Sequence, residues 1–239
     1  MTMIVRNLQL VRDRMTTACA TAGRAPLEVR LLAVSKKFPV EAVITAIESG
    51  QHTFGENYIA EGVEKILALQ AWQATQPEKL DAPLEWHCIG PVQSNKTRLV
   101  AEHFDWVQSV DRLKIAQRLS EQRPPHLPPL NICLQVNLDG GANKSGVAPH
   151  ELQELVQAVA SLPRLSLRGL MTIPEPAVDF EAACAIHTQA RAVFDQINRS
   201  GLLVSPMDTL SMGMTADLEA AIASGSTMVR VGTAIFGQR

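Results

Sequence analysis

The sequence predicts a single (β/α)8 barrel of the TIM type with an extra helix at its N-terminus. Short apolar runs alternate with longer runs in which apolar residues recur at helical spacing, and this alternation is typical of βα units in a parallel sheet. About eight such units fit into the 239 residues, which is the size of a barrel of this kind. An open, doubly wound sheet is the alternative. No shift in composition marks a boundary, so we expect one domain, residues 1–239.

The chain starts with a segment that predicts an amphipathic helix. Apolar residues at helical spacing, Ile4, Leu8, Val11, Met15 and Cys19, are interleaved with arginines and an aspartate. A signal peptide would instead have an uninterrupted apolar stretch.

The strands and helices of the barrel then follow in alternation. We expect strands at residues 29–34, 52–55, 85–89, 105–110, 131–137, 167–173, 207–211 and 227–231. We expect helices at residues 39–49, 57–72, 95–103, 111–122, 149–161, 179–200 and 215–224, with a short turn after residue 232. Several helix ends have suitable residues: Asp111 as a cap, Pro149 in a first turn, and Gly50, Gly201 and Gly225 just past a last turn.

The composition argues against several functional classes. The 22 Lys and Arg residues nearly balance the 24 Asp and Glu residues, so no net field favours nucleic acid or an anionic membrane. No apolar run approaches the roughly 20 residues that cross a bilayer. The four cysteines, Cys19, Cys88, Cys133 and Cys184, lack the spacing of metal ligands, as expected of reduced, buried cysteines. We therefore expect a cytoplasmic protein without a bound metal.

Lys36 follows the first expected strand, where the apolar run ends. Ligands of parallel α/β folds bind at the carboxyl ends of the strands, so this amine is expected to face a site. A lysine taken out of water is more readily neutral, and a neutral amine condenses with carbonyl groups into Schiff bases. A solvated loop lysine is the alternative.

Polar residues follow other expected strands as well. Asn57 follows the second strand, and Asn143 and Lys144 lie in a loop after the fifth. Turn chemistry explains each of them alone, so the evidence for a site is their coincidence on one face. His87 lies inside the third strand, where a core histidine is the alternative to a functional one. His187 falls on an expected helix, and we expect it at the surface.

The C-terminal part of the chain predicts an anion site. Ser211 ends the seventh strand and is followed by Gly213 and by the start of a helix near Thr215. A hydroxyl, a glycine that allows close approach and the free amides of a helix N-terminus can bind a phosphate. Ordinary capping by Thr215 is an equal alternative. Gly232 and Thr233 follow the eighth strand, and phosphate sites of these barrels lie after strands seven and eight. A lysine and a phosphate cradle across one barrel mouth suit a phosphorylated aldehyde.

Six segments carry a resemblance to a known family: AVSKKFP (33–39), FGENY (54–58), WHCIGPVQSNK (86–96), NKSG (143–146), GLMTIP (169–174) and LSMGMTADLEAAIASGSTMVRVGTAIFG (210–237). They occur in order over essentially the whole chain. The sequence thereby resembles the pyridoxal 5'-phosphate (PLP) homeostasis protein family, which is similar to the N-terminal barrel of alanine racemase. Lys37 and Phe38 depart from the family pattern, in which threonine and lysine are more typical.

The resemblance implies cofactor-binding roles for eight residues. They are Lys36 for the Schiff base, Ser211, Gly232 and Thr233 for the phosphate, Gly213 for close approach of its loop, Arg230 for the pyridine nitrogen, and Asn57 and His87 for the lining of the pocket. No catalytic residue is implied.

Three functions compete. The resemblance implies a carrier that binds PLP as a Schiff base and buffers or delivers it without substantial catalysis. A PLP-dependent amino-acid racemase needs a second acid or base opposite the first, and we expect the domain that would bring the opposing tyrosine to be absent, since Tyr58 is the only tyrosine. A Schiff-base aldolase without cofactor predicts a colourless protein. We favour the carrier, a monomer whose partners are the small-molecule cofactor and PLP-dependent apoenzymes, with neither nucleic acid nor membrane as partner.

Overall fold

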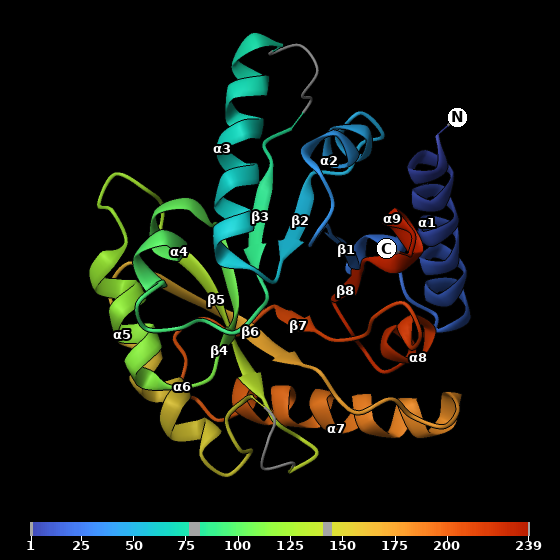
Figure 1. The fold of residues 1–239 in the computed structure, drawn as a ribbon. Coiled ribbons are helices and arrows are strands. Elements are labelled where there is room, and N and C mark those ends of the chain that lie inside the picture. The colour runs from blue at the N-terminus through green and yellow to red at the C-terminus, as the bar shows by residue number, and fades with distance from the viewer. Residues whose placement is uncertain (1, 77–81, 141–144, 239) are drawn as a thin grey trace.

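The computed structural model describes residues 2–76, 82–140 and 145–238. Eight parallel strands pair in chain order, and β8 pairs with β1 to close the barrel (Figure 1). The predicted (β/α)8 barrel is confirmed, and the open sheet is wrong. Within the described residues, no helix combines the length and the apolar character needed to span a bilayer.

The observed elements lie close to the predicted ranges. The strands are β1 (Arg30–Val34), β2 (Thr53–Glu56), β3 (Glu85–Cys88), β4 (Trp106–Val110), β5 (Leu130–Val136), β6 (Leu165–Thr172), β7 (Thr209–Ser211) and β8 (Met228–Val231). The helices are α1 (Met3–Thr21), η1 (Pro26–Glu28), α2 (Val40–Ile47), α3 (Ile59–Thr75), α4 (Thr97–His103), α5 (Leu113–Gln122), α6 (Leu152–Ala160), α7 (Phe180–Arg199), α8 (Leu218–Ala223) and α9 (Thr233–Phe236). The turn expected after residue 232 is therefore the short helix α9.

Three of the predicted helix ends are confirmed, and two are wrong. Gly50, Gly201 and Gly225 have positive φ angles of 75°, 75° and 91°, the conformation that ends a helix and favours glycine. Asp111 does not cap α5, because the cap is the next residue and the Asp111 carboxylate accepts a hydrogen bond from that residue's guanidinium. Pro149 lies in a turn before α6, which begins only at Leu152.

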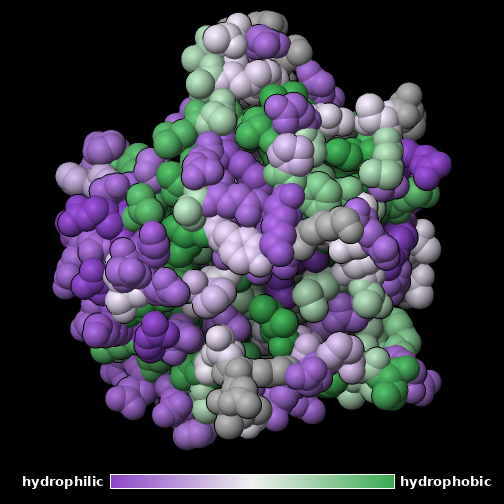
Figure 2. Space-filling model, viewed as in Figure 1, coloured by the Kyte–Doolittle hydropathy of each residue, from purple (hydrophilic) through white to green (hydrophobic). Residues whose placement is uncertain are grey.

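The N-terminal helix is amphipathic as predicted, and it covers the last two helices. Its buried residues are Leu8, Val11, Met15, Ala18 and Cys19. Figure 1 shows α1 beside α8 and α9, and Arg24 fixes this contact by donating to the carbonyl oxygens of Ile222 and Ser226, at 2.8 Å each. Hydrophilic residues dominate the opposite side of the molecule, over α5 and α6 (Figure 2).

The hydrophobic core has an outer layer and an interior. The outer layer lies between the strands and the surrounding helices and contains most buried apolar side chains. The interior of the barrel holds two small apolar clusters, one of Leu32, Val34, Ile89 and Met228 and one of Trp106, Cys133 and Met171. Buried polar side chains of β3, β4, β7 and β8 also lie in the interior, and they lead to the candidate site.

Candidate functional site

The carboxyl ends of the eight strands meet at one rim of the barrel, the mouth. Lys36 lies two residues beyond β1, Asn57 directly after β2, Gly213 two residues beyond β7, and Gly232 and Thr233 directly after β8. The closed parallel barrel therefore places these residues at one rim, as the strand order predicts. Asn143 and Lys144 lie outside the described residues.

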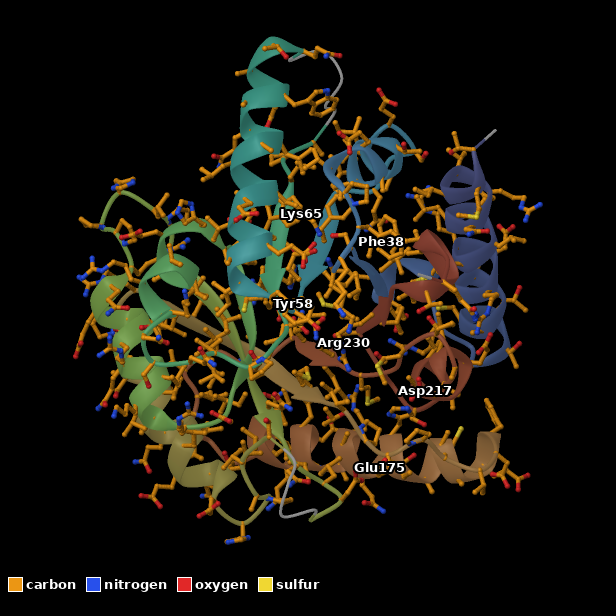
Figure 3. The ribbon with its side chains drawn as sticks, viewed as in Figure 1. Phe38, Tyr58, Lys65, Glu175, Asp217 and Arg230 are labelled. Atoms are coloured by element: carbon orange, nitrogen blue, oxygen red, sulfur yellow. The ribbon has the colours of Figure 1, made fainter. Side chains whose placement is uncertain are left out.

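A cavity of about 510 Å³ opens at this rim. We call it the mouth pocket. Its lining comes from β5 and from the loops after five strands: Asn57, Ile89, Gly90, Pro91, Gln135, Ser145, Ile173, Pro174, Glu175, Pro176 and Met214. Figure 3 shows Tyr58 and Arg230 near the centre of the barrel, and Glu175 towards α7.

The buried side-chain oxygens that lack a hydrogen-bond partner within the described residues include two that lie near the mouth. These two are Oδ1 of Asn57, after β2, and Oγ1 of Thr172, the last residue of β6. The Asn57 backbone is held by Gly90, where a Cβ would lie only 2.0 Å from the Asn57 carbonyl oxygen. Buried polar atoms are normally hydrogen-bonded, so this pair favours a polar ligand at the mouth.

A chain of hydrogen bonds runs through the barrel interior from Arg230 to Glu85. Arg230 Nη1 lies 2.8 Å from Ser211 Oγ, and Ser211 Oγ lies 2.6 Å from Gln108 Oε1. Gln108 Nε2 lies 2.8 Å from His87 Nδ1. His87 Nε2 lies 2.8 Å from Glu85 Oε1. A guanidinium can only donate and an ionised carboxylate can only accept. Arg230 must donate at one end and Glu85 must accept at the other, so the donor of every bond lies on the Arg230 side. Nε2 of His87 therefore carries the ring proton.

His87 lies in this interior chain and not in the lining of the mouth pocket. The ring is fully buried and stacks on Trp106, with the ring centroids 5.0 Å apart. Burial lowers the pKa of His87, which keeps the ring neutral, although the neighbouring Glu85 acts in the opposite direction. Burial alone would raise the pKa of Glu85, but its bonds to His87 and the charge of Arg30 hold it at about 2. This geometry favours the core-histidine alternative, and a cofactor contact of His87 stays a prediction.

Arg230 is a buried cation beside the mouth. Its side chain is 4% exposed, and its second nitrogen Nη2 donates to the carbonyl oxygen of Thr172 at 2.7 Å. Burial lowers the pKa of Arg230 to about 10, so the side chain stays charged at neutral pH. Among the described residues no carboxylate forms an ion pair with it. Because a buried charge without a counterion is costly, a ligand that accepts a hydrogen bond would stabilise this arrangement.

The loop between β7 and α8 packs closely against α8 because residue 213 is a glycine. Gly213 has a φ of +90°, and a Cβ there would lie 2.3 Å from the Cβ of Ala221. Two backbone bonds tie the loop to β8, from Met212 N to Met228 O and from Arg230 N to Gly213 O. Ser211 is fully buried at the start of this loop, with its hydroxyl already bonded to Arg230 and Gln108. Its role in phosphate binding stays a prediction.

Gly232 and Thr233 form the start of α9. The first intrahelical bonds run from the amides of Ile235 and Phe236 to the carbonyl oxygen of Gly232. The amides of Thr233 and Ala234 precede these bonds, and the first amides of a helix lack an intrahelical acceptor. A Cβ on Gly232 would approach the Val34 carbonyl oxygen to 3.1 Å. Gly232 therefore packs closely against the end of β1, and the Thr233 side chain is exposed next to these amides.

The loop that carries Lys36 is held by a buried ion pair, which the sequence reasoning missed. Lys65 of α3 lies 2.8 Å from Glu56 Oε1 and 2.7 Å from the carbonyl oxygen of Ser35. The Ser35 hydroxyl donates to the same carboxylate oxygen at 2.7 Å. Beyond Lys36, the Lys37 backbone has a positive φ of 63°. Lys36 itself is half-buried, so the backbone on its N-terminal side is fixed while its side chain stays accessible.

Lys65→Met is expected to destabilise the fold by about 3 to 5 kcal/mol, because it leaves the Glu56 carboxylate, 1% exposed, without its counterion. Lys114→Met, at an exposed position of α5, is the matched control and should change the free energy of unfolding by less than about 0.5 kcal/mol. Urea denaturation measures both. Equal stability losses in the two variants would contradict a structural role of the ion pair.

His187 is buried and not at the surface, so that prediction is wrong. It is 1% exposed, and its Nε2 lies 2.9 Å from Asp217 Oδ2. Ala183, Ala190 and Phe194, the buried neighbours of His187 on α7, follow a helical period, and this period was the sequence signal for its burial. Capping by Thr215, the alternative to an anion site, is not observed, since α8 begins at Leu218 with Asp217 as its cap residue.

Comparisons with known proteins agree with this fold. The family model for the alanine racemase N-terminal domain matches residues 6–239. The curated relatives include the pyridoxal phosphate homeostasis protein of Pseudomonas aeruginosa, 53% identical over 100% of this chain and 97% of the relative. The protein of that name from Escherichia coli is 51% identical over 99% of this chain and 97% of its own.

Solved structures give the same picture. PipY of Synechococcus elongatus with PLP bound has 33% identity and a TM-score of 0.80, covering 98% of this chain and 100% of PipY. An alanine racemase from Clostridium difficile has 17% identity and a TM-score of 0.67, and the match covers 98% of this chain but 57% of the racemase. At that identity the racemase shares the fold alone.

Proposed function

Because the chain belongs to the alanine racemase N-terminal domain family and to the pyridoxal phosphate homeostasis proteins, we propose that residues 1–239 form one PLP-binding domain. In this proposal the protein holds the cofactor as a Schiff base on Lys36 and buffers or delivers it, with no substantial catalysis of its own. The observation that carries the proposal is the identity of 51% and 53%, over at least 99% of this chain, to proteins of that name.

The residues at the mouth fit the cofactor. Bound PLP supplies an aldehyde that condenses with a primary amine, and a pyridine ring that can accept electrons. Lys36 would supply the amine from a loop held by Ser35 and Lys65. Gly213, Gly232 and Thr233 would hold the phosphate with backbone amides and a hydroxyl, aided by Ser211. Asn57, with its buried unpartnered oxygen, would accept a hydrogen bond from the ligand, and His87 would support Arg230 through the interior chain.

Arg230, in a site where Lys36 is the one evident base among the described residues, supports a carrier over a racemase, which needs a second acid or base. Its guanidinium is charged at neutral pH and has only donors, so a ring nitrogen that it contacts must accept a hydrogen bond and stay unprotonated. An unprotonated pyridine is a poor electron acceptor for the carbanion that racemisation requires. The interior chain from Ser211 to Glu85 holds Arg230 in this donating role. PLP-dependent apoenzymes are the proposed recipients of the cofactor, and the carrier is proposed to act as a monomer.

We test the proposal by incubating the PLP-loaded protein with L-alanine in deuterated water. A carrier shows a change of the visible spectrum as the amine competes with Lys36, but no exchange of the α-hydrogen. Exchange or formation of the D-isomer at about 1 per second or faster, a rate typical of enzymes, would instead establish the racemase. A protein that stays colourless with PLP would overturn the proposal altogether, and the cofactor-free aldolase would then be tested next.

A further inference from the structure

Asp217 connects the β7–α8 loop to helix α7. One carboxylate oxygen, Oδ1, accepts the backbone amide of Met214 at 2.7 Å, and the other, Oδ2, lies 2.9 Å from Nε2 of His187. The Asp217 amide bonds back to the Met214 carbonyl oxygen at 3.3 Å. The segment 214–217 is thus closed into a tight turn, and its carboxylate is bonded to a buried side chain of a different helix.

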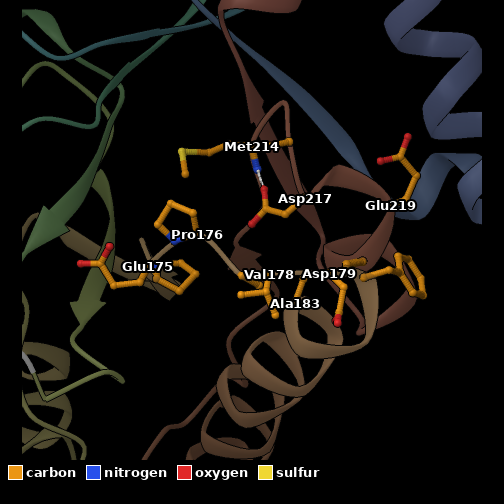
Figure 4. Close-up of a pocket in the computed structure, with 13 residues that line it drawn as sticks. Glu175, Pro176, Val178, Asp179, Ala183, Met214, Asp217 and Glu219 are labelled. Atoms are coloured by element: carbon orange, nitrogen blue, oxygen red, sulfur yellow. Dashed lines mark hydrogen bonds between the residues drawn. The ribbon is translucent and has the colours of Figure 1, made fainter.

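The Asp217 side chain lines a cavity that adjoins the mouth pocket. Asp217 and Met214 line a neighbouring cavity of about 340 Å³, which we call the side pocket. Met214 also lines the mouth pocket, whereas Asp217 does not. Figure 4 shows the Asp217 carboxylate beneath the Met214 amide, with their hydrogen bond drawn between them. Pro174, Glu175 and Pro176 line both cavities, so the two adjoin. The Asp217 charge acts to raise the pKa of Arg230, against the larger opposing effect of burial.

His187 provides the fixed end of the connection. A carboxylate can only accept, so Nε2 of His187 carries the proton of their bond. The other ring nitrogen, Nδ1, is buried without a hydrogen-bond partner within the described residues, so the bond to Asp217 is what orients the ring. Burial would raise the pKa of Asp217, but its bonds to His187 and to the Met214 amide outweigh burial and lower it. The carboxylate is therefore ionised at neutral pH and is a strong acceptor for the loop amide.

We propose that His187 is a positioning residue, which acts through Asp217 to hold the 212–217 loop in the shape that binds the phosphate of the ligand. This inference rests on the proposed function for the identity of the ligand. The N-terminal part of the loop is held to β8 by the backbone bonds of Met212 and Gly213. The part that begins at Met214 is held by Asp217. Losing His187 therefore impairs selection of phosphorylated over unphosphorylated aldehydes, while the rest of the site is preserved.

The test compares dissociation constants for PLP and for pyridoxal, which lacks the phosphate. His187→Phe should weaken PLP binding about tenfold, the effect of losing one hydrogen bond to a charged group, and leave pyridoxal binding unchanged. His187→Gln, which keeps a donor at the place of Nε2, should restore the wild-type ratio of the two constants. Equal losses for both aldehydes, or no loss for either, would overturn the positioning role.

A second measurement needs no ligand. Hydrogen exchange of the Met214 amide should become faster in His187→Phe, whereas the Met212 amide, bonded to Met228 O in β8, serves as the internal control and should not change. Unchanged protection of Met214 would refute the connection even if PLP binds. If the wild-type protein binds no PLP but the Met214 amide exchanges faster in His187→Phe than in the wild type, the proposed function is refuted and the connection stands. If His187→Phe does not fold, Asp217→Asn, which lacks the second acceptor oxygen, carries the same two measurements.

Discussion

Replacing Lys36 by alanine is expected to abolish the imine absorbance of the PLP-loaded protein while the barrel stays folded. The absorbance arises from the Schiff base, and in our proposal Lys36 supplies the amine. Stability should change little, because Lys36 is a half-buried side chain at the rim and the outer core lies beneath the helices. Absorption spectra at equal protein and cofactor concentrations measure the first effect, and thermal denaturation measures the second.

The neighbouring lysine is the matched control for this result. Lys37 is exposed, and its Nζ lies 5.5 Å from the centroid of the Tyr58 ring, so Lys37→Ala should keep the absorbance. Borohydride reduction of the loaded wild-type protein, followed by peptide mapping, should locate the cofactor on Lys36. A label on Lys37 or Lys144 would contradict the assignment, and so would a Lys36→Ala variant with undiminished absorbance.

The phosphate group is expected to contribute most of the affinity for the cofactor. Hydrogen bonds to a charged group contribute about 1.5 to 3 kcal/mol each, and in our proposal backbone amides near Gly213 and Gly232 and the Thr233 hydroxyl form several of them. PLP should therefore bind at least about a hundredfold more tightly than pyridoxal, which corresponds to roughly 2.8 kcal/mol. Titrations of the absorbance with each aldehyde measure the two constants. Comparable constants would exclude a phosphate cradle at this rim.

A substitution at the rim tests whether the Thr233 hydroxyl contributes to phosphate binding. Thr233→Val removes one hydroxyl from an exposed position, and it should weaken PLP binding about tenfold without affecting pyridoxal. Thr21→Val is the control, because the Thr21 hydroxyl bonds to the carbonyl oxygen of Thr17 within α1. If both variants bound PLP like the wild type, the amides alone would hold the phosphate and the role of Thr233 would be wrong.

Most of the fold was predictable because its signals are local. A buried parallel strand and an amphipathic helix each leave a hydrophobic period in a short window of sequence, and glycines with positive φ mark helix ends such as Gly50 and Gly225. Two of the errors concern the start of a helix. Asp111 was expected to cap a helix, but its carboxylate bonds to Arg112. Thr215 was expected to start a helix that begins only at Leu218.

The candidate site was predictable only in part. In a closed parallel barrel the residues after the strands must meet at one rim, so the strand ends by themselves place Lys36, Asn57, Gly213, Gly232 and Thr233 at the mouth. Lys65 was missed, because a lysine in the middle of a helix normally faces solvent. Its burial follows only from the position of Glu56 and the Ser35 carbonyl group opposite it.

The sequence alone thus determined the barrel, the chain order of its strands and the rim on which the candidate site lies, since these depend on hydrophobic periods and on topology. Only the tertiary structure decided which buried polar groups are hydrogen-bond partners of one another. Ser211 bonds to Gln108 across 103 positions of the chain, and His187 to Asp217 across 30. A buried polar atom needs a partner, but any donor or acceptor brought close by packing satisfies it. Such pairs leave no period in the sequence, and they position Arg230, the Lys36 loop and the loop of Gly213.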